Sequence, residues 1–137
     1  MIDDGIWLER AQEMYDDGVI TYSAPRGNYR RQFRLLEEQL GLNFKRVKRR
    51  EAEIVCLYRE IENEKFGGLA ELKPKHIVLT TEPVYRNTKI EAHEIGHALG
   101  LDHMERGTNS VMNYDWSRND FFTPVDLQNI SIVYDLQ

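Results

Sequence analysis

The stretch HEIGHALGLDH, residues 93–103, decides how the rest of this 137-residue chain is interpreted. On an α-helix, His93 and His97 lie one turn apart and about 40° apart around the axis, so both face the same side. Two imidazoles placed in this way can bind one metal ion. Glu94 directly follows the first of them, so its carboxylate can reach a water on that ion without being a ligand itself.

The end of this stretch predicts a third ligand. Gly100 accepts the left-handed backbone conformation that ends many helices, and the reversed chain can bring His103 back toward the first two histidines. Three protein nitrogens and one water are typical of a catalytic zinc site, whereas a structural site has four protein ligands. We therefore expect one catalytic Zn²⁺ on His93, His97 and His103, with Glu94 as general base and then general acid.

Regular elements are expected on both sides of this stretch. Thr88 and Glu91 have capping-box spacing, which predicts a helix over about 89–99. Asn28 as cap and Gly41 as terminator bound another helix, whose apolar stripe predicts a core face. Thr123, with Pro124 after it, starts a last helix. The remaining expected elements are a short helix over 6–15 and strands over 19–23, 42–49 (basic), 53–58 (apolar on both faces, hence central), 67–72 and 76–80.

The chain resembles the metzincin zinc endopeptidases, and most closely the catalytic domain of the matrixins. HEIGHALGLDH has every fixed position of the metzincin motif, and Ser110 to Met112 (SVM) resembles the methionine turn that follows it. The order of strands and helices over about 19–136 is also similar. The resemblance implies one α/β (α+β) catalytic domain over 1–137 with a twisted mixed sheet, a backing helix, a zinc-binding helix and a C-terminal helix. The upper part would end near 103 and the lower part would span about 104–137.

This resemblance also implies roles for individual residues. The chain would hydrolyse peptide bonds in a peptide or protein substrate, with Met112 as an apolar floor beneath the zinc ligands. The edge strand containing Leu69 and Ala70 would pair antiparallel with the substrate backbone. The alternative is a zinc-bound module that holds an extended peptide without cleaving it.

Several features differ from the matrixins. Asn113 and Tyr114 follow the turn methionine in place of Tyr-Pro, an arrangement that resembles the astacins and serralysins. Tyr114 then has two interpretations, as a donor to the developing oxyanion or as a packing residue. The matrixin structural zinc and calcium sites have no evident counterpart, so His76 is not expected to bind metal and calcium is left open. No cysteine-switch segment is present.

Three further residues near the motif also allow two interpretations. Asp102 could orient an imidazole or be an exposed turn residue. Phe121 and Phe122 could form the wall of a substrate pocket or pack the last helix, and packing is favoured.

Charge and composition indicate a globular domain, with 30% charged residues and a net charge of −5. Residues 26–50 carry nine basic and two acidic side chains. They could bind a polyanion, but a solvated face is the simpler interpretation, and nucleic acid is not expected as a partner. The sequence has no signal-peptide pattern and no transmembrane run, and we expect a monomer without a membrane partner. Cys56 lies in an apolar run and is expected to be a buried, inert thiol.

Overall fold

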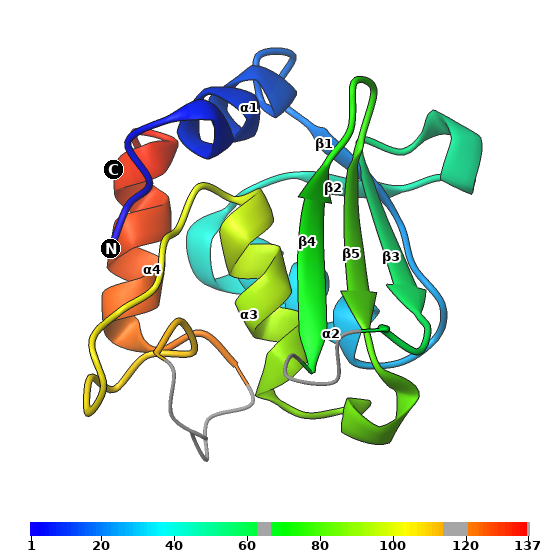
Figure 1. Ribbon diagram of the computed structural model, residues 1–137. Helices are drawn as coiled ribbons and strands as arrows, with labels where there is room; N and C mark the ends of the chain where they lie inside the picture. Colours follow the sequence, from blue (N-terminus) through cyan, green and yellow to red (C-terminus); the bar gives the residue numbers. More distant parts are fainter. Residues whose placement is uncertain (63–66, 114–120, 137) are drawn as a thin grey trace.

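A computed structural model describes residues 1–62, 67–113 and 121–136 (Figure 1). Its centre is a five-stranded mixed sheet in the order β2-β1-β3-β5-β4. These strands are β1 (Ile20–Ser23), β2 (Phe44–Arg46), β3 (Ile54–Tyr58), β4 (Gly68–Leu72) and β5 (Ile77–Thr81). All neighbours pair in parallel except β4, which runs antiparallel to β5 and forms one edge. The expected α/β class with a mixed sheet is therefore confirmed.

Helices cover one face of the sheet. They are α1 (Ile6–Met14), α2 (Asn28–Leu40), α3 (Lys89–Ala98) and α4 (Pro124–Val133), with short 3₁₀ turns η1 (Arg49–Glu51) and η2 (Pro83–Tyr85). Helix α3 packs along β4 and β5, and α2 packs beside α3. Helices α1 and α4 pack on each other and lie on the side of α3 away from the sheet (Figure 1). Helix α3 therefore packs on the sheet, on α2 and on α1.

The core follows from alternation in the strands and from the apolar stripe of α2. Tyr29, Phe33 and Leu36 of α2 are fully buried, as their helical spacing predicts. Strand β3 lies in the middle of the sheet, and its first three residues are buried on both faces, which confirms the central strand. Cys56 is one of them, and burial raises the pKa of its thiol, as expected of an inert cysteine.

Two local predictions were wrong. Gly27, not Asn28, precedes α2, and Asn28 is its first helical residue. The Asn28 side chain is buried because its amide donates to the carbonyl of Thr88 at 3.1 Å and thus joins α2 to the start of α3. The basic strand expected over 42–49 is only Phe44–Arg46, because the chain turns into η1 after it.

The basic side chains of residues 26–50 lie mostly on the surface, as expected of a solvated face. Lys45, Arg46, Lys48, Arg49 and Arg50 are all exposed. Within the described part of the chain, no helix combines the length and apolarity needed to cross a lipid bilayer.

Candidate metal centre

The start of α3 is fixed by the predicted capping box. The Thr88 side chain accepts a backbone hydrogen bond from the first turn, and Glu91 accepts from the Thr88 N–H at 3.2 Å. Glu91 is fully buried and also accepts from the Asn87 N–H at 2.7 Å and from the Tyr58 hydroxyl at 2.8 Å. Since Tyr58 belongs to β3, one carboxylate both caps the helix and fixes it to the sheet.

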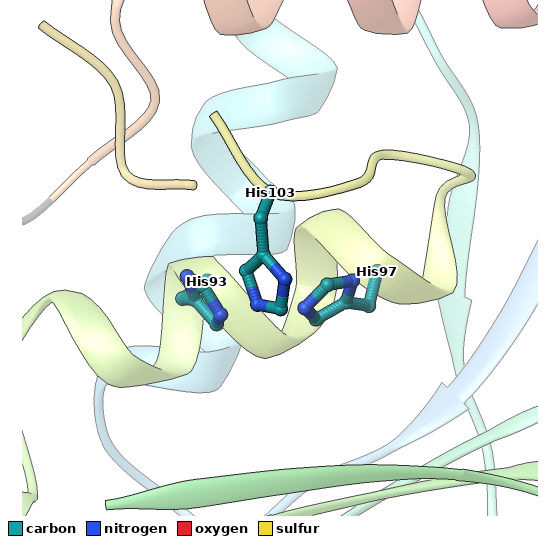
Figure 2. Close-up of side chains that lie close together, drawn as sticks. All are labelled: His93, His97 and His103. Carbon is teal, nitrogen blue, oxygen red and sulfur yellow. The ribbon is translucent and has the colours of Figure 1, made fainter. Parts of the chain in front are cut away.

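The end of α3 also agrees with the prediction made from the sequence. Leu99 ends the helix, and Gly100 has φ +90°, the left-handed conformation that favours glycine. The Leu101 N–H then donates to the Gly96 carbonyl at 2.9 Å. This reversal returns the chain over the helix and places His103 opposite His93 and His97 (Figure 2).

The three histidines converge. Their ring centroids are 4.9 Å apart for His93 and His97, 5.2 Å for His93 and His103, and 4.7 Å for His97 and His103. One nitrogen of each ring lies within 4.8 Å of the other two, so the three residues could hold one metal ion. Three imidazoles suit zinc and other transition metals better than the oxygen-seeking magnesium or calcium.

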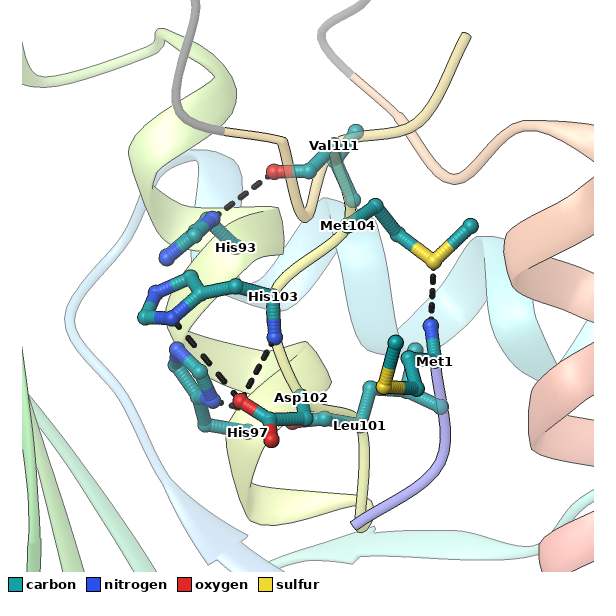
Figure 3. A network of polar contacts seen from close by, with 8 residues as sticks. All are labelled: Met1, His93, His97, Leu101, Asp102, His103, Met104 and Val111. Atoms are coloured by element: carbon teal, nitrogen blue, oxygen red, sulfur yellow. Dashed lines mark hydrogen bonds and ion pairs between the residues drawn. The ribbon is translucent and has the colours of Figure 1, made fainter. Parts of the chain in front are cut away.

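The nitrogens that face away from this centre have partners of their own. Nδ1 of His93 lies 2.8 Å from the Val111 carbonyl, and Nδ1 of His97 lies 2.9 Å from the Leu101 carbonyl (Figure 3). A carbonyl can only accept, so both Nδ1 atoms carry the hydrogen and both Nε2 atoms offer a lone pair. This arrangement fixes the tautomer that ligation requires.

Burial keeps these imidazoles uncharged. Burial and the neighbouring His97 ring lower the pKa of His93 to about 3. Burial and the neighbouring His103 ring lower the pKa of His97 to about 4. Burial also lowers the pKa of His103, although Asp102 opposes the shift. Neutral imidazoles at pH 7 are the form that binds metal, so the donor set fits a zinc ion.

Glu94 lies beside the histidines but does not belong to the group of residues that could hold the metal ion. Its side chain is only 4% exposed, and burial raises the pKa of its carboxyl to about 8. It lines a cavity of about 600 Å³ together with all three histidines. A buried carboxyl whose pKa lies near neutrality, next to three histidines that could hold a metal ion, is suited to taking up and releasing a proton.

Met112, expected as an apolar floor beneath the zinc ligands, packs against α3. Its side chain is fully buried, and its sulfur lies so close to Gly96 of α3 that any β-carbon at Gly96 would collide with it. The Met104 N–H donates to the Met112 carbonyl at 3.0 Å, which pairs this turn with the residue after His103. The segment around Met112 is thereby packed against the helix that carries His93 and His97.

The edge strand β4 forms one side of the cavity. Gly68, Leu69 and Ala70 all line it, and Leu69 is 38% exposed. Strand β5 pairs with one side of β4, and no strand of the described residues pairs with the other. The two residues assigned to substrate binding therefore lie next to the histidines.

The other residues singled out from the sequence differ in how they are placed relative to the three histidines. Asp102 is exposed, with Oδ1 accepting from the His103 N–H at 2.7 Å and lying 3.8 Å from the His103 Nδ1. His76 is not in the histidine cluster. Phe122 is buried in the core against Gly96, which agrees with the packing interpretation, and the half-buried Phe121 packs on the same core. Tyr114 lies outside the described residues.

One carboxylate, expected from the sequence only as an acid at the start of the last helix, has buried contacts that were not predicted. Asp126 of α4 is fully buried, and its Oδ1 accepts from the Ser110 hydroxyl at 2.5 Å. Its Oδ2 accepts from the Val111 N–H and the Thr123 N–H, both at 3.0 Å, and from the Thr123 hydroxyl at 2.9 Å. The Thr123-x-x-Asp126 spacing could have revealed the capping box, but nothing local reveals the contacts to Ser110 and Val111.

Asp126 reaches His93 through a short chain of hydrogen bonds. The Ser110 hydroxyl, which donates to Asp126, accepts from the Met112 N–H at 2.9 Å. That N–H and the Val111 carbonyl, which accepts from His93, belong to the same peptide unit. Asp126 therefore helps to orient a histidine on another helix.

Gly68 provides a test of the geometry around Glu94. A β-carbon there would lie 2.6 Å from Cγ2 of Ile90 and 2.8 Å from Oε2 of Glu94. We expect Gly68→Ala to displace either β4 or the Glu94 carboxylate, and to lower any turnover about tenfold or more while zinc stays bound. Gly5→Ala is the matched control, since its nearest neighbour would be 3.7 Å away. Full turnover in Gly68→Ala would show that the close approach is unimportant.

Comparisons with known proteins identify a shared fold. No protein-family model matches the chain, and no curated protein matches its sequence. Among solved structures, a chain of the structure titled "GM1 bound form of the ECX AB5 holotoxin" matches with a TM-score of 0.64 and 14% sequence identity. The match covers 90% of this chain and 82% of that chain. At this identity the likeness shows the fold alone.

Proposed function

We propose that this protein is a zinc-dependent endopeptidase of the metzincin type, with a matrixin-like catalytic domain. The observation that carries the proposal is the joint placement of three convergent histidines, the buried Glu94 and an edge strand along one cavity. The sequence motif and the methionine turn support the same assignment. The packing of α3 on β4 and β5 of the mixed sheet also supports the assignment.

Zinc, when bound, would supply Lewis acidity toward the scissile carbonyl and lower the pKa of water to about 7. Glu94 would then accept the proton of the attacking water and pass it to the leaving amine. Its burial favours both halves of this transfer, because a carboxyl whose pKa lies near neutrality can hold the proton briefly and release it. His93, His97 and His103 would stay neutral and act only as ligands.

The substrate would lie along β4. An extended peptide adding to this edge would obtain backbone hydrogen bonds from Leu69 and its neighbours, and its scissile bond would lie near the histidines. Leu69 and Ala70 are proposed as the residues of this contact. Tyr114 is retained as a proposed oxyanion donor, on the basis of the sequence alone.

Metal removal tests this proposal directly. We expect the zinc-loaded protein to cleave members of a proteome-derived peptide library, a chelator to abolish the cleavage, and added zinc to restore it. His97→Ala should lose both metal and cleavage, because one of three nitrogen ligands is gone. His76→Ala is the matched control, since His76 lies away from the triad.

The same experiment decides between cleavage and binding alone. If the zinc-loaded protein binds extended peptides but leaves every library member intact, the chain is a non-cleaving peptide-binding module and the endopeptidase proposal is wrong.

A further inference from the structure

The peptide unit between Leu101 and Asp102 is hydrogen-bonded at both ends. Its carbonyl accepts from Nδ1 of His97 at 2.9 Å, and its N–H donates to the carbonyl of Met1 at 2.7 Å. The N–H and C=O of a trans peptide point in opposite directions, so the three groups form one continuous chain of hydrogen bonds. The hydrogen bonds in such a chain polarise and strengthen one another. Met1 is thus joined to His97 through one intervening peptide.

Residues 1–3 pair with residues 100–102 as a short antiparallel bridge. Ile2 lies opposite Leu101, and the Asp3 N–H donates to the Gly100 carbonyl at 2.8 Å. The Asp3 carboxylate then accepts from the Gly5 and Leu8 N–H groups at 2.8 and 3.2 Å, which anchors it to the start of α1. From α1, the Trp7 ring lies 6.2 Å from the His97 ring.

This bridge acts on the segment that supplies the third ligand. Residues 100–102 connect the end of α3 to His103, and within them only Gly100 has a conformation that requires glycine. Without the bridge, the backbone hydrogen bonds of this reversal would be those from the Leu101 N–H to Gly96 and from the Gly100 N–H to His97. When the bridge is present, residues 1–3 fix both the Leu101 carbonyl that orients His97 and the backbone that leads to His103.

We propose that residues 1–3 are a positioning element of the metal centre, which raises metal affinity by fixing the 100–102 backbone. The inference rests on the proposed metal site and is independent of peptide cleavage. Partners in the outer shell of a metal site typically change its affinity 10–100-fold, and we expect an effect at the lower end of this range.

Three variants distinguish the effect of the bridge hydrogen bond from the effects of neighbouring side chains. Asp3→Pro removes the N–H that donates to Gly100 and also the carboxylate. Asp3→Ala keeps the N–H and removes only the carboxylate. Asp4→Ala changes an exposed side chain next to the bridge and leaves the hydrogen bonds of Met1 and Asp3 in place.

The readouts are zinc affinity, by competition with a coloured chelator, and the visible spectrum of the Co²⁺-loaded protein. We expect Asp3→Pro to weaken zinc binding about tenfold and to change the Co²⁺ spectrum, which reports ligand geometry. Asp3→Ala and Asp4→Ala should bind zinc within about threefold of the unaltered protein and should show the same Co²⁺ spectrum. A folded Asp3→Pro variant with unaltered affinity and spectrum would overturn the proposal, and so would an equal loss in Asp3→Ala.

A second measurement requires no variant, in case Asp3→Pro does not fold. Coupling between two sites is reciprocal, so metal binding must strengthen the bridge as much as the bridge strengthens metal binding. We expect zinc to slow hydrogen exchange of the Asp3 and Asp102 amides about tenfold, measured by nuclear magnetic resonance. The Val19 amide, which bonds to Asp17 far from the triad, is the control. Unchanged exchange at Asp3 and Asp102 would overturn the proposal, whether or not the protein cleaves peptides.

Discussion

Replacing Glu94 with glutamine should leave zinc bound and reduce peptide cleavage about 10²–10⁴-fold. Glutamine has nearly the same shape as glutamate, so it fits the buried position beneath Gly68, but it cannot accept the proton of the attacking water. The three histidines are unchanged, and glutamine is neutral, so no charged group is added to the buried site. The loss should therefore appear in turnover and not in metal content.

Glu94→Gln is measured by zinc content, by peptide binding and by cleavage of the best library peptide. Glu94→Ala should behave alike in cleavage, because it also lacks the proton acceptor. Glu38→Gln, an equal change of charge on the exposed side of α2, is the matched control and should cleave normally. A zinc-loaded Glu94→Gln protein with normal turnover would exclude Glu94 as the base.

Replacing Asp126 with alanine should cost about 3–5 kcal/mol of folding free energy. The substitution leaves the Ser110 hydroxyl and the N–H groups of Val111 and Thr123 without their acceptor inside the protein, whereas the Thr123 hydroxyl keeps the Asn109 carbonyl at 2.7 Å. A loss of this size is a large part of the 5–15 kcal/mol that stabilises a typical domain. Since the same contacts hold the Val111–Met112 peptide against His93, zinc affinity should fall as well, about tenfold or more.

The measurements for Asp126 are thermal unfolding of the metal-free protein and zinc affinity. Asp126→Asn should recover part of the stability, because one oxygen remains to accept from the backbone. Gln128→Ala, at an exposed position of the same helix, should unfold like the unaltered protein. If Asp126→Ala unfolds at the usual temperature and binds zinc normally, the chain of hydrogen bonds from α4 to His93 has no energetic role.

Local sequence patterns predicted most of the site. The spacing of His93 and His97, the cap at Thr88 and the exit at Gly100 each depend on residues within about one helical turn, where backbone geometry is fixed by the helix itself. The same holds for the core stripe of α2 and the central strand β3. The two local errors, at Asn28 and in the strand over 42–49, arose where a distant partner or a turn overrode the local preference.

Only the tertiary structure decided which distant groups support the ligands. The Val111 and Leu101 carbonyls, the Asp126 carboxylate and the bridge of residues 1–3 to 100–102 join positions far apart in the chain, or depend on side-chain directions that spacing does not set. The closeness of Gly68 to Glu94 likewise depends on β4 being an antiparallel edge strand above α3. The sequence by itself thus predicted the three converging histidines and the proposed base, because a helix and the glycine that ends it set their spacing. Packing of separate elements determined how those ligands are oriented, because hydrogen bonds between distant segments form only once the chain is folded.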